Sequence, residues 1–176
     1  MERIFVKEIK KIGSLKPKIE KALDVKLNFT KTHIEISANN EDGLSEYLAE
    51  KVIEAIAMGF SPESAFQLKS EDYMFEKIDI KKHVKQSRVK AVKARLIGRK
   101  GKAKSTLENL TECEIEIKGH YIGIIGETTK ASFALDALKK MVKGSPHNKV
   151  YAYLERNHEQ VKLREDEEES LFEEKQ

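Results

Sequence analysis

The chain has 176 residues, of which 39% are hydrophobic and 36% are charged, so it can form one large domain or two small ones under a densely ionised surface. No uncharged stretch approaches the ~20 apolar residues of a membrane-spanning helix, and residues 1–6 lack the apolar segment of a secretory signal. The single cysteine, Cys113, excludes an internal disulfide, and one thiol with five scattered histidines forms no zinc-finger pattern. These features predict a cytoplasmic protein that needs no metal or cofactor.

The first part of the chain predicts a strand, two helices, a strand pair and a long helix. These elements are expected at residues 3–7, 8–12, 17–23, 25–29, 33–36 and 40–59. The strand pair follows from alternating apolar and polar residues. Ser61-Pro62-Glu63 then has the N-cap residue, N1 proline and first-turn acid of a further short helix.

The second part predicts the same order of elements again. Its strand, two helices, two strands and helix are expected at residues 75–80, 87–97, 102–110, 114–118, 121–125 and 128–142. Repetition of this β-α-α-β-β-α order, with a period of roughly 75 residues, indicates a tandem duplication. The predicted fold class is α+β, with two domains that each pack a three-stranded antiparallel sheet against helices.

The predicted domain boundaries follow from this repeat. The first domain covers residues 1–74, and the second covers residues 75–157 and ends in a short amphipathic helix at 147–156. Residues 158–176 are so acidic and so poor in core-forming side chains that we expect a disordered tail.

Charge is strongly segregated along the chain. Residues 1–76 carry a net charge of −3, residues 77–157 carry +11, and residues 158–176 carry −5. Within the middle block, residues 85–104 contain nine Lys or Arg and no acid. Because such a run repels itself unless a polyanion relieves it, the middle block is expected to contact nucleic acid.

Gly98-Arg99-Lys100-Gly101 interrupts the two predicted helices of this basic block. Glycine lets the backbone approach a phosphate without a Cβ in the way, and the N-terminus of the following helix offers free N–H groups and a positive dipole end. Arg99 and Lys100 add positive charge. The pattern therefore predicts a clamp for the sugar-phosphate backbone of a single RNA strand. Gly123-Ile-Ile-Gly126 has the same spacing but no basic centre, so we interpret it as structural.

Other residues near the turn are predicted to complete the site. Apolar side chains before and after it, together with the following strand, are expected to support the bases. Neighbouring cations add to the electrostatic attraction, and His120 in the turn between the last two strands either stacks on a base or is simply exposed. The predicted RNA-binding residues are Lys93, Arg95, Leu96, Ile97, Gly98, Arg99, Lys100, Gly101, Lys102, Lys104, Ile115, Ile117, Lys118 and His120, with Leu107 as a further apolar support.

The run Ala94-Arg-Leu-Ile-Gly-Arg-Lys-Gly-Lys102, followed by Leu107-Glu-Asn-Leu-Thr111, closely resembles the core of a KH domain. The segments 55–65 and 121–154 narrow the resemblance to one family of KH-domain proteins. Residues 1–157 as a whole are similar to the tandem-KH family of ribosomal RNA-processing proteins, the archaeal relatives of the eukaryotic small-subunit assembly factor "partner of Nob one". This resemblance implies a type I KH fold in each half.

The resemblance also implies a function and partners. These are binding near the 3′ end of small-subunit ribosomal RNA, beside the Nob endonuclease and the rRNA dimethyladenosine methyltransferase, and association with the alpha subunit of translation initiation factor two. The first half departs from the family pattern because Gly13-Ser14-Leu15-Lys16 stands where a GxxG would be. A role in protein binding or packing is therefore favoured for that half over RNA clamping.

Other classes of function are weaker interpretations. An enzyme would need a convergent polar site, and the five histidines lie in different predicted elements without a nucleophile or paired carboxylates. The alternative is a protein adaptor that binds initiation factor two alpha, with RNA contact secondary. A KH subunit of the RNA-degrading exosome ranks third. Tyr151 and Tyr153 are either stacking groups or packing residues of their helix.

Overall fold

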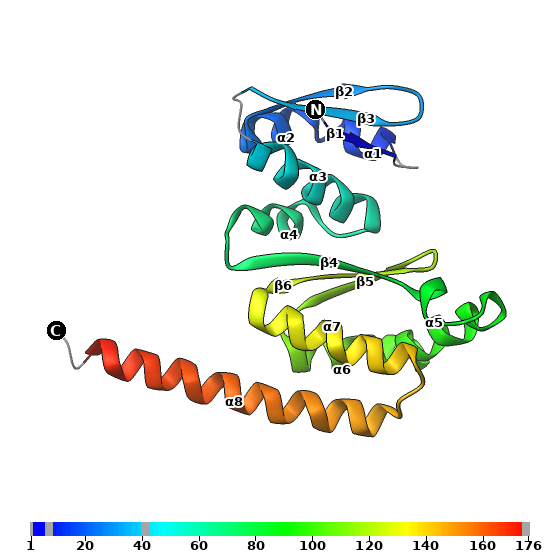
Figure 1. Ribbon diagram of the computed structural model, residues 1–176, viewed down its shortest axis with the longest axis vertical. Coiled ribbons are helices and arrows are strands. Elements are labelled where there is room, and N and C mark those ends of the chain that lie inside the picture. The colour runs from blue at the N-terminus through cyan, green and yellow to red at the C-terminus, as the bar shows by residue number, and fades with distance from the viewer. Residues whose placement is uncertain (1, 6–8, 40–42, 174–176) are drawn as a thin grey trace. The chain divides into compact units, whose positions relative to one another are not determined.

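A computed structural model describes residues 2–5, 9–39 and 43–173, and the side chains of these residues except 2, 11 and 164–173 (Figure 1). The chain divides into two units, Met1–Phe75 and Glu76–Gln176, so the division lies one residue from the expected boundary. Parts of the predicted first strand, first helix and long helix fall on residues 6–8 and 40–42, which lie outside the described residues. No helix among the described residues is long and apolar enough to cross a membrane.

The first unit has the predicted order of elements. They are β1 (Glu2–Ile4), α1 (Ile9–Gly13), α2 (Lys16–Leu23), β2 (Val25–Phe29), β3 (Ile34–Ala38), α3 (Gly43–Met58), α4 (Pro62–Phe66) and a 3₁₀ turn at Gln67–Lys69. The antiparallel sheet has the order β1-β3-β2. Alternation along β2 buries Val25 and Leu27, and the helical spacing of Ile19 and Leu23 buries the inner face of α2. The Ser61 hydroxyl caps α4 by accepting a hydrogen bond from the Ser64 N–H at 3.1 Å, as predicted.

The second unit repeats this arrangement. Its elements are β4 (Tyr73–Asp79), α5 (Val89–Ile97), α6 (Lys102–Thr111), β5 (Glu114–Lys118), β6 (Tyr121–Glu127), α7 (Thr128–Val142) and α8 (His147–Glu173), with 3₁₀ turns at Ile80–Lys82, Gln86–Arg88 and Arg99–Gly101. The sheet has the order β4-β6-β5. Figure 1 shows α6 and α7 on the same face of it. The predicted fold class, two tandem units that each pack a three-stranded antiparallel sheet against helices, is confirmed.

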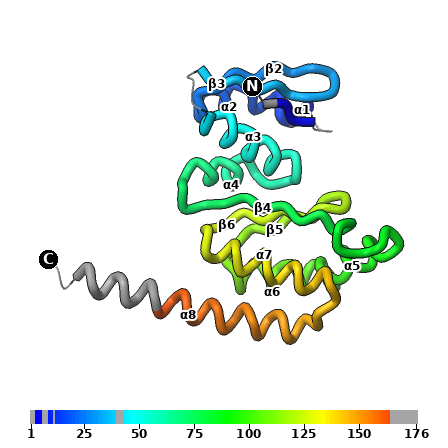
Figure 2. The backbone as a smooth tube through the Cα atoms, in the orientation of Figure 1, coloured from blue at the N-terminus to red at the C-terminus, as the bar shows by residue number. Residues whose placement is uncertain are grey.

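The prediction of a disordered tail from residue 158 was wrong for the described part of the tail, because α8 continues to Glu173 as one helix of 27 residues (Figure 1). Figure 2 shows the first turns of α8, in orange, beside α7. Its first turns pack against α6 and α7 through Val150 and Leu154, both buried. The remainder is rich in Glu, Gln, Lys and Leu, which have high helix propensity, so a helix nucleated on the packed turns can propagate.

The offset between corresponding positions of the two units varies along the chain. In the first unit the Glu20 carboxylate accepts from the Leu27 N–H at 2.8 Å, and in the second Glu108 accepts from the Ile115 N–H at 3.0 Å. Each of these positions lies 88 residues after its counterpart, from 20 to 108 and from 27 to 115. The register of the central strand pairs agrees with the same offset. The predicted period of roughly 75 residues is close to the offset of the first strands, since β4 begins 71 residues after β1. It is too short for the positions from α2 to β3, because the chain between the first strand and the first helix is longer in the second unit.

Candidate nucleic-acid interface

The GxxG loop, residues 98–101, joins α5 to α6 as predicted. Gly98 ends α5, and its N–H donates to the Ala94 carbonyl oxygen at 2.9 Å. Lys100 and Gly101 both have positive φ angles, 53° and 76°, and Gly101 is the N-cap of α6. This turn leaves the side chains of Arg99 and Lys100 exposed, and Lys102 is exposed at the start of α6.

The two glycines of the loop are required for different reasons. Gly98 has φ 74° and ψ 177°, and an added Cβ would lie 2.6 Å from the Ala103 Cβ and 2.8 Å from its backbone nitrogen. Gly101 also has a positive φ, but an added Cβ there would meet nothing within 4 Å. Position 98 thus requires glycine because the loop approaches α6 closely, whereas position 101 favours glycine only because of its backbone conformation.

The turn collects three of the predicted cations, Arg99, Lys100 and Lys102, at the N-terminal end of α6. Free N–H groups and the positive end of the helix dipole point toward the same place, so the loop can hold a phosphate. Lys93 is half-buried on α5, one helical turn before Ile97.

Arg95 was expected to contribute to RNA binding, and the structure gives it a different role. Its guanidinium donates to the carbonyl oxygens of Met141, at 3.1 Å, and Ser145. These carbonyls lie at the C-terminal end of α7 and just beyond it, where helix carbonyls lack intrahelical partners. Arg95 therefore ties α5 to the end of α7.

Lys104 is also engaged. Its amine lies 3.3 Å from the carboxylates of Glu108, one turn along α6, and Glu116 on β5. Burial works against the charged amine, yet the two carboxylates outweigh it and raise the pKa of Lys104. With two negative partners nearby, Lys104 adds little net attraction for phosphate.

The predicted apolar support for bases is mostly core. Leu96, Leu107 and Ile115 are each only 1% exposed, so a base cannot reach them. Ile97, which is 38% exposed, and Ile117, which is half-buried on β5, remain accessible. The spacing of these residues identified the inner faces of α6 and β5 correctly but not the depth of burial.

His120 and Lys118 lie around the turn between β5 and β6. The His120 ring packs on Tyr121 with ring centroids 4.1 Å apart, and its Nε2 lies 3.8 Å from an Asp79 carboxylate oxygen. Its carbonyl oxygen accepts from the Ile80 N–H at 2.9 Å. His120 is therefore held against the neighbouring strands, and its contact with RNA stays a prediction.

Gly126, the second glycine of the other GxxG pattern, has a packing function. A Cβ on Gly126 would lie 2.4 Å from the Cys113 sulfur. Burial raises the pKa of the Cys113 thiol to about 11, so the thiol is protonated at neutral pH. Both residues belong to the core between β5 and β6.

The first unit has a helix–helix joint at the corresponding place but no GxxG sequence. Gly13-Ser14-Leu15-Lys16 spans this joint as expected, because α1 ends at Gly13 and α2 begins at Lys16. The 88-residue offset does not extend through the joint, because α2 begins 86 residues before α6 and α1 ends 84 residues before α5. The joint has no second glycine, and the half-buried Leu15 stands where the GxxG loop has an exposed cation.

Sequence reasoning left the role of Tyr151 open, and the structure places it beside the GxxG loop. Tyr151 and His147, from the first turns of α8, line a hollow together with Gly98 and Arg99. Tyr153 lies elsewhere, with the Lys140 amine 3.4 Å from its ring centroid. The sequence signal for this pair was the helical spacing of His147 and Tyr151, but only the packing of α8 on α6 brings both residues to the loop.

Within the described residues, no group of three or more His, Cys, Asp or Glu could hold a metal ion.

Known proteins resemble the chain over most of its length. Residues 74–159 match the family described as "Eukaryotic type KH-domain (KH-domain type I)". The chain is 33% identical to the KH domain-containing protein MJ0443 of Methanocaldococcus jannaschii, across 88% of this chain and 70% of that protein. It is 27% identical to the RNA-binding protein pno-1 of Caenorhabditis briggsae, across 86% of this chain and 54% of the nematode protein, so it spans about half the length of that relative.

Solved structures also resemble the chain over most of its length. The crystal structure of a protein of unknown function, APE0754 from Aeropyrum pernix, has a TM-score of 0.85 at 28% identity, with 97% of each chain covered. Dim2p of Pyrococcus horikoshii has a TM-score of 0.76 at 31% identity, with 88% of this chain and 98% of that chain covered. In the complex of a/eIF2alpha, aDim2p and rRNA from the same organism, the TM-score is 0.79 at 30% identity, with 90% and 94% covered.

The repeated unit and the GxxG loop define a tandem protein of type I KH domains. This chain belongs to the KH-domain family of ribosomal RNA-processing proteins that includes eukaryotic PNO1 and archaeal Dim2. The family resemblance predicted from the sequence is confirmed.

Proposed function

We propose that the chain is an RNA-binding factor in maturation of the small ribosomal subunit, and that the GxxG loop clamps single-stranded rRNA near its 3′ end. The observation that carries the proposal is the loop itself, where Arg99, Lys100 and Lys102 are exposed around the free N–H groups at the start of α6. The names of relatives support it, since they include RNA-binding protein pno-1 and pre-rRNA-processing protein pno1.

The clamp has a defined electrostatic signature. If it neutralises about four phosphates, the logarithm of the binding constant falls with a slope near −2.8 against the logarithm of salt concentration, by the rule of ~0.7 per single-strand phosphate. A fourfold rise in salt then weakens binding roughly 50-fold. An affinity that does not change with salt would contradict the clamp.

The decisive variant is Arg99→Asp with Lys100→Asp, measured by fluorescence anisotropy on a short RNA with the 3′-terminal sequence of small-subunit rRNA. Both side chains are exposed, and aspartate tolerates the left-handed backbone at position 100, so the variant is expected to fold. It removes about two phosphate contacts and flattens the salt slope by at least ~1.4.

The matched control is Leu15→Asp with Lys16→Asp, which places two acids at the corresponding joint between α1 and α2 of the first unit. We expect little loss of RNA affinity, because that joint lacks the second glycine of the loop and has Leu15 in place of a basic centre. Equal loss in two variants that both retain wild-type circular dichroism would make the first unit a second RNA clamp.

A protein adaptor is the second candidate, and one observation favours it: the Dim2p structure that resembles this chain was solved with a/eIF2alpha and rRNA together. Nuclease treatment of the native complex separates the two candidates, because an adaptor stays bound to initiation factor two alpha after its RNA is digested. Association with the Nob endonuclease and the dimethyladenosine methyltransferase stays a prediction, as does the absence of catalysis.

A further inference from the structure

A shallow hollow of about 340 Å³ lies beside the GxxG loop in the second unit. Ala103 and Thr106 line it from α6, and His147 and Tyr151 line it from α8. Gly98 and the exposed Arg99 and Lys102 complete the lining on the side of the loop. The hollow therefore combines a cationic edge with an aromatic wall, and it adjoins the residues proposed to hold a phosphate.

The aromatic wall is fixed before any ligand arrives. The His147 Nε2–H donates to the Arg95 carbonyl oxygen at 3.1 Å, which anchors this ring to α5. The His147 and Tyr151 rings lie 5.8 Å apart at an angle of 53°. Both side chains are half-buried, and burial raises the pKa of the Tyr151 phenol, which keeps it neutral. A ligand that enters the hollow thus meets rings that need no ordering.

The second tyrosine of α8 provides a contrast. Tyr153 is also half-buried, but the Lys140 amine occupies the face of its ring at 3.4 Å from the centroid. It does not line the hollow. Tyr151 is therefore the tyrosine of this pair whose ring is available beside the loop.

The chemistry of the hollow selects its ligand. Arg99 and Lys102 favour an anion, the flat rings favour a planar heterocycle, and the glycine at position 98 keeps the loop backbone open. A nucleotide has both an anion and a planar heterocycle, separated by one sugar. We propose that this hollow binds a base of the RNA strand, stacked on Tyr151, whose neighbouring phosphate lies on the GxxG loop. This inference rests on the proposed function.

Three variants test it by anisotropy on the same short RNA. Tyr151→Ala removes the stacking surface and weakens binding by about fivefold or more, as expected for loss of one stacked base. Tyr151→Phe retains the ring and stays within about twofold of the wild type. Tyr153→Ala is the matched control, because it makes the same truncation on the same helix outside the hollow, and it leaves affinity unchanged.

A second measurement separates stacking from a general loosening of α8. An abasic sugar is placed at each RNA position in turn and measured with the wild type and with Tyr151→Ala. One position is expected to weaken wild-type binding by about fivefold and to have no further effect in the variant, which is the signature of a direct contact. If no position shows this coupling, Tyr151 is a packing residue and the inference is wrong.

The clamp variant distinguishes failure of this inference from failure of the proposed function. If Arg99→Asp with Lys100→Asp abolishes binding while Tyr151→Ala has no effect, the clamp stands and the base site is refuted. If neither variant affects affinity, the proposed function fails as well.

Discussion

Replacement of each loop glycine by alanine separates the two reasons for glycine in the GxxG loop. At Gly98, alanine would adopt a backbone conformation used almost only by glycine, which costs ~1–3 kcal/mol. Its Cβ would also lie 2.6 Å from the Ala103 Cβ, and relief of such overpacking costs a further ~1–3 kcal/mol. We therefore expect Gly98→Ala to lower the free energy of unfolding by about 3 kcal/mol or more.

Gly101→Ala is the matched comparison. The added Cβ meets nothing within 4 Å, so only the left-handed conformation is penalised, at ~1–2 kcal/mol. The difference between the two variants is then about 2 kcal/mol, equivalent to roughly 10 °C in Tm for a domain of this size. Thermal melts followed by circular dichroism measure this difference, and fluorescence anisotropy measures the RNA affinity of each variant.

The close approach of Gly98 to α6 predicts more than lower stability. Because relief of the overlap moves the loop away from Ala103, Gly98→Ala should also weaken RNA binding in the fraction that remains folded, whereas Gly101→Ala should weaken it less. Equal losses of Tm in the two variants would refute the assignment of Gly98 to close packing.

Three further outcomes follow from the contacts in the second unit. Cys113, whose buried thiol has its pKa raised to about 11, should resist alkylation at neutral pH until the protein unfolds, as followed by mass spectrometry. Arg95→Ala should lower stability by about 2 kcal/mol through loss of charge-assisted hydrogen bonds, and Arg95→Lys should not restore it, because a single amine cannot reproduce the planar fork. The Lys130 amine, 2.8 Å from Glu112, lowers the pKa of that carboxyl below its ordinary value of 4.5. Wild type should therefore be more stable than Glu112→Gln, by at most ~1 kcal/mol because the pair is exposed. This difference should be complete above pH 4.5 and vanish as the pH falls through the lowered pKa of Glu112, as measured by urea titrations at each pH.

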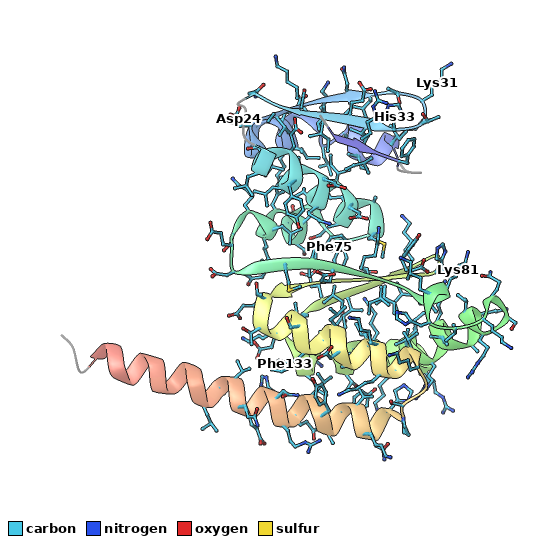
Figure 3. All side chains as sticks on the ribbon, in the orientation of Figure 1. Asp24, Lys31, His33, Phe75, Lys81 and Phe133 are labelled. Carbon is cyan, nitrogen blue, oxygen red and sulfur yellow. The ribbon has the colours of Figure 1, made fainter. Side chains whose placement is uncertain are left out.

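Periodicity and turn chemistry predicted the elements of both units because those signals are local. Each strand and helix core is encoded by side chains two, three or four positions apart. The GxxG loop was found for the same reason, since four consecutive residues carry it. Figure 3 shows the product of these local signals, with the labelled His33 and Lys31 at the hairpin between β2 and β3.

Contacts between distant segments were not predictable in this way. Arg95 has a side chain typical of a phosphate ligand, but its guanidinium donates hydrogen bonds to carbonyl oxygens 46 and 50 residues later. Lys104 is paired with Glu116, which lies on a different element. The register of the duplication likewise became visible only through hydrogen bonds such as that from Leu27 to Glu20, because the two halves share few residues.

Those long-range contacts change what the basic run of residues 85–104 can do. Its nine cations predict strong attraction for RNA if all are free, yet Arg95 and Lys104 already have partners within the protein. The contacts that remove Arg95 from the phosphate site also join α5 to the end of α7, and the Arg95 carbonyl oxygen accepts from His147 at the start of α8. If the proposed base site is correct, we expect residue 95 to act in RNA binding through its backbone carbonyl, which holds His147 beside the loop, rather than through the charge of its guanidinium.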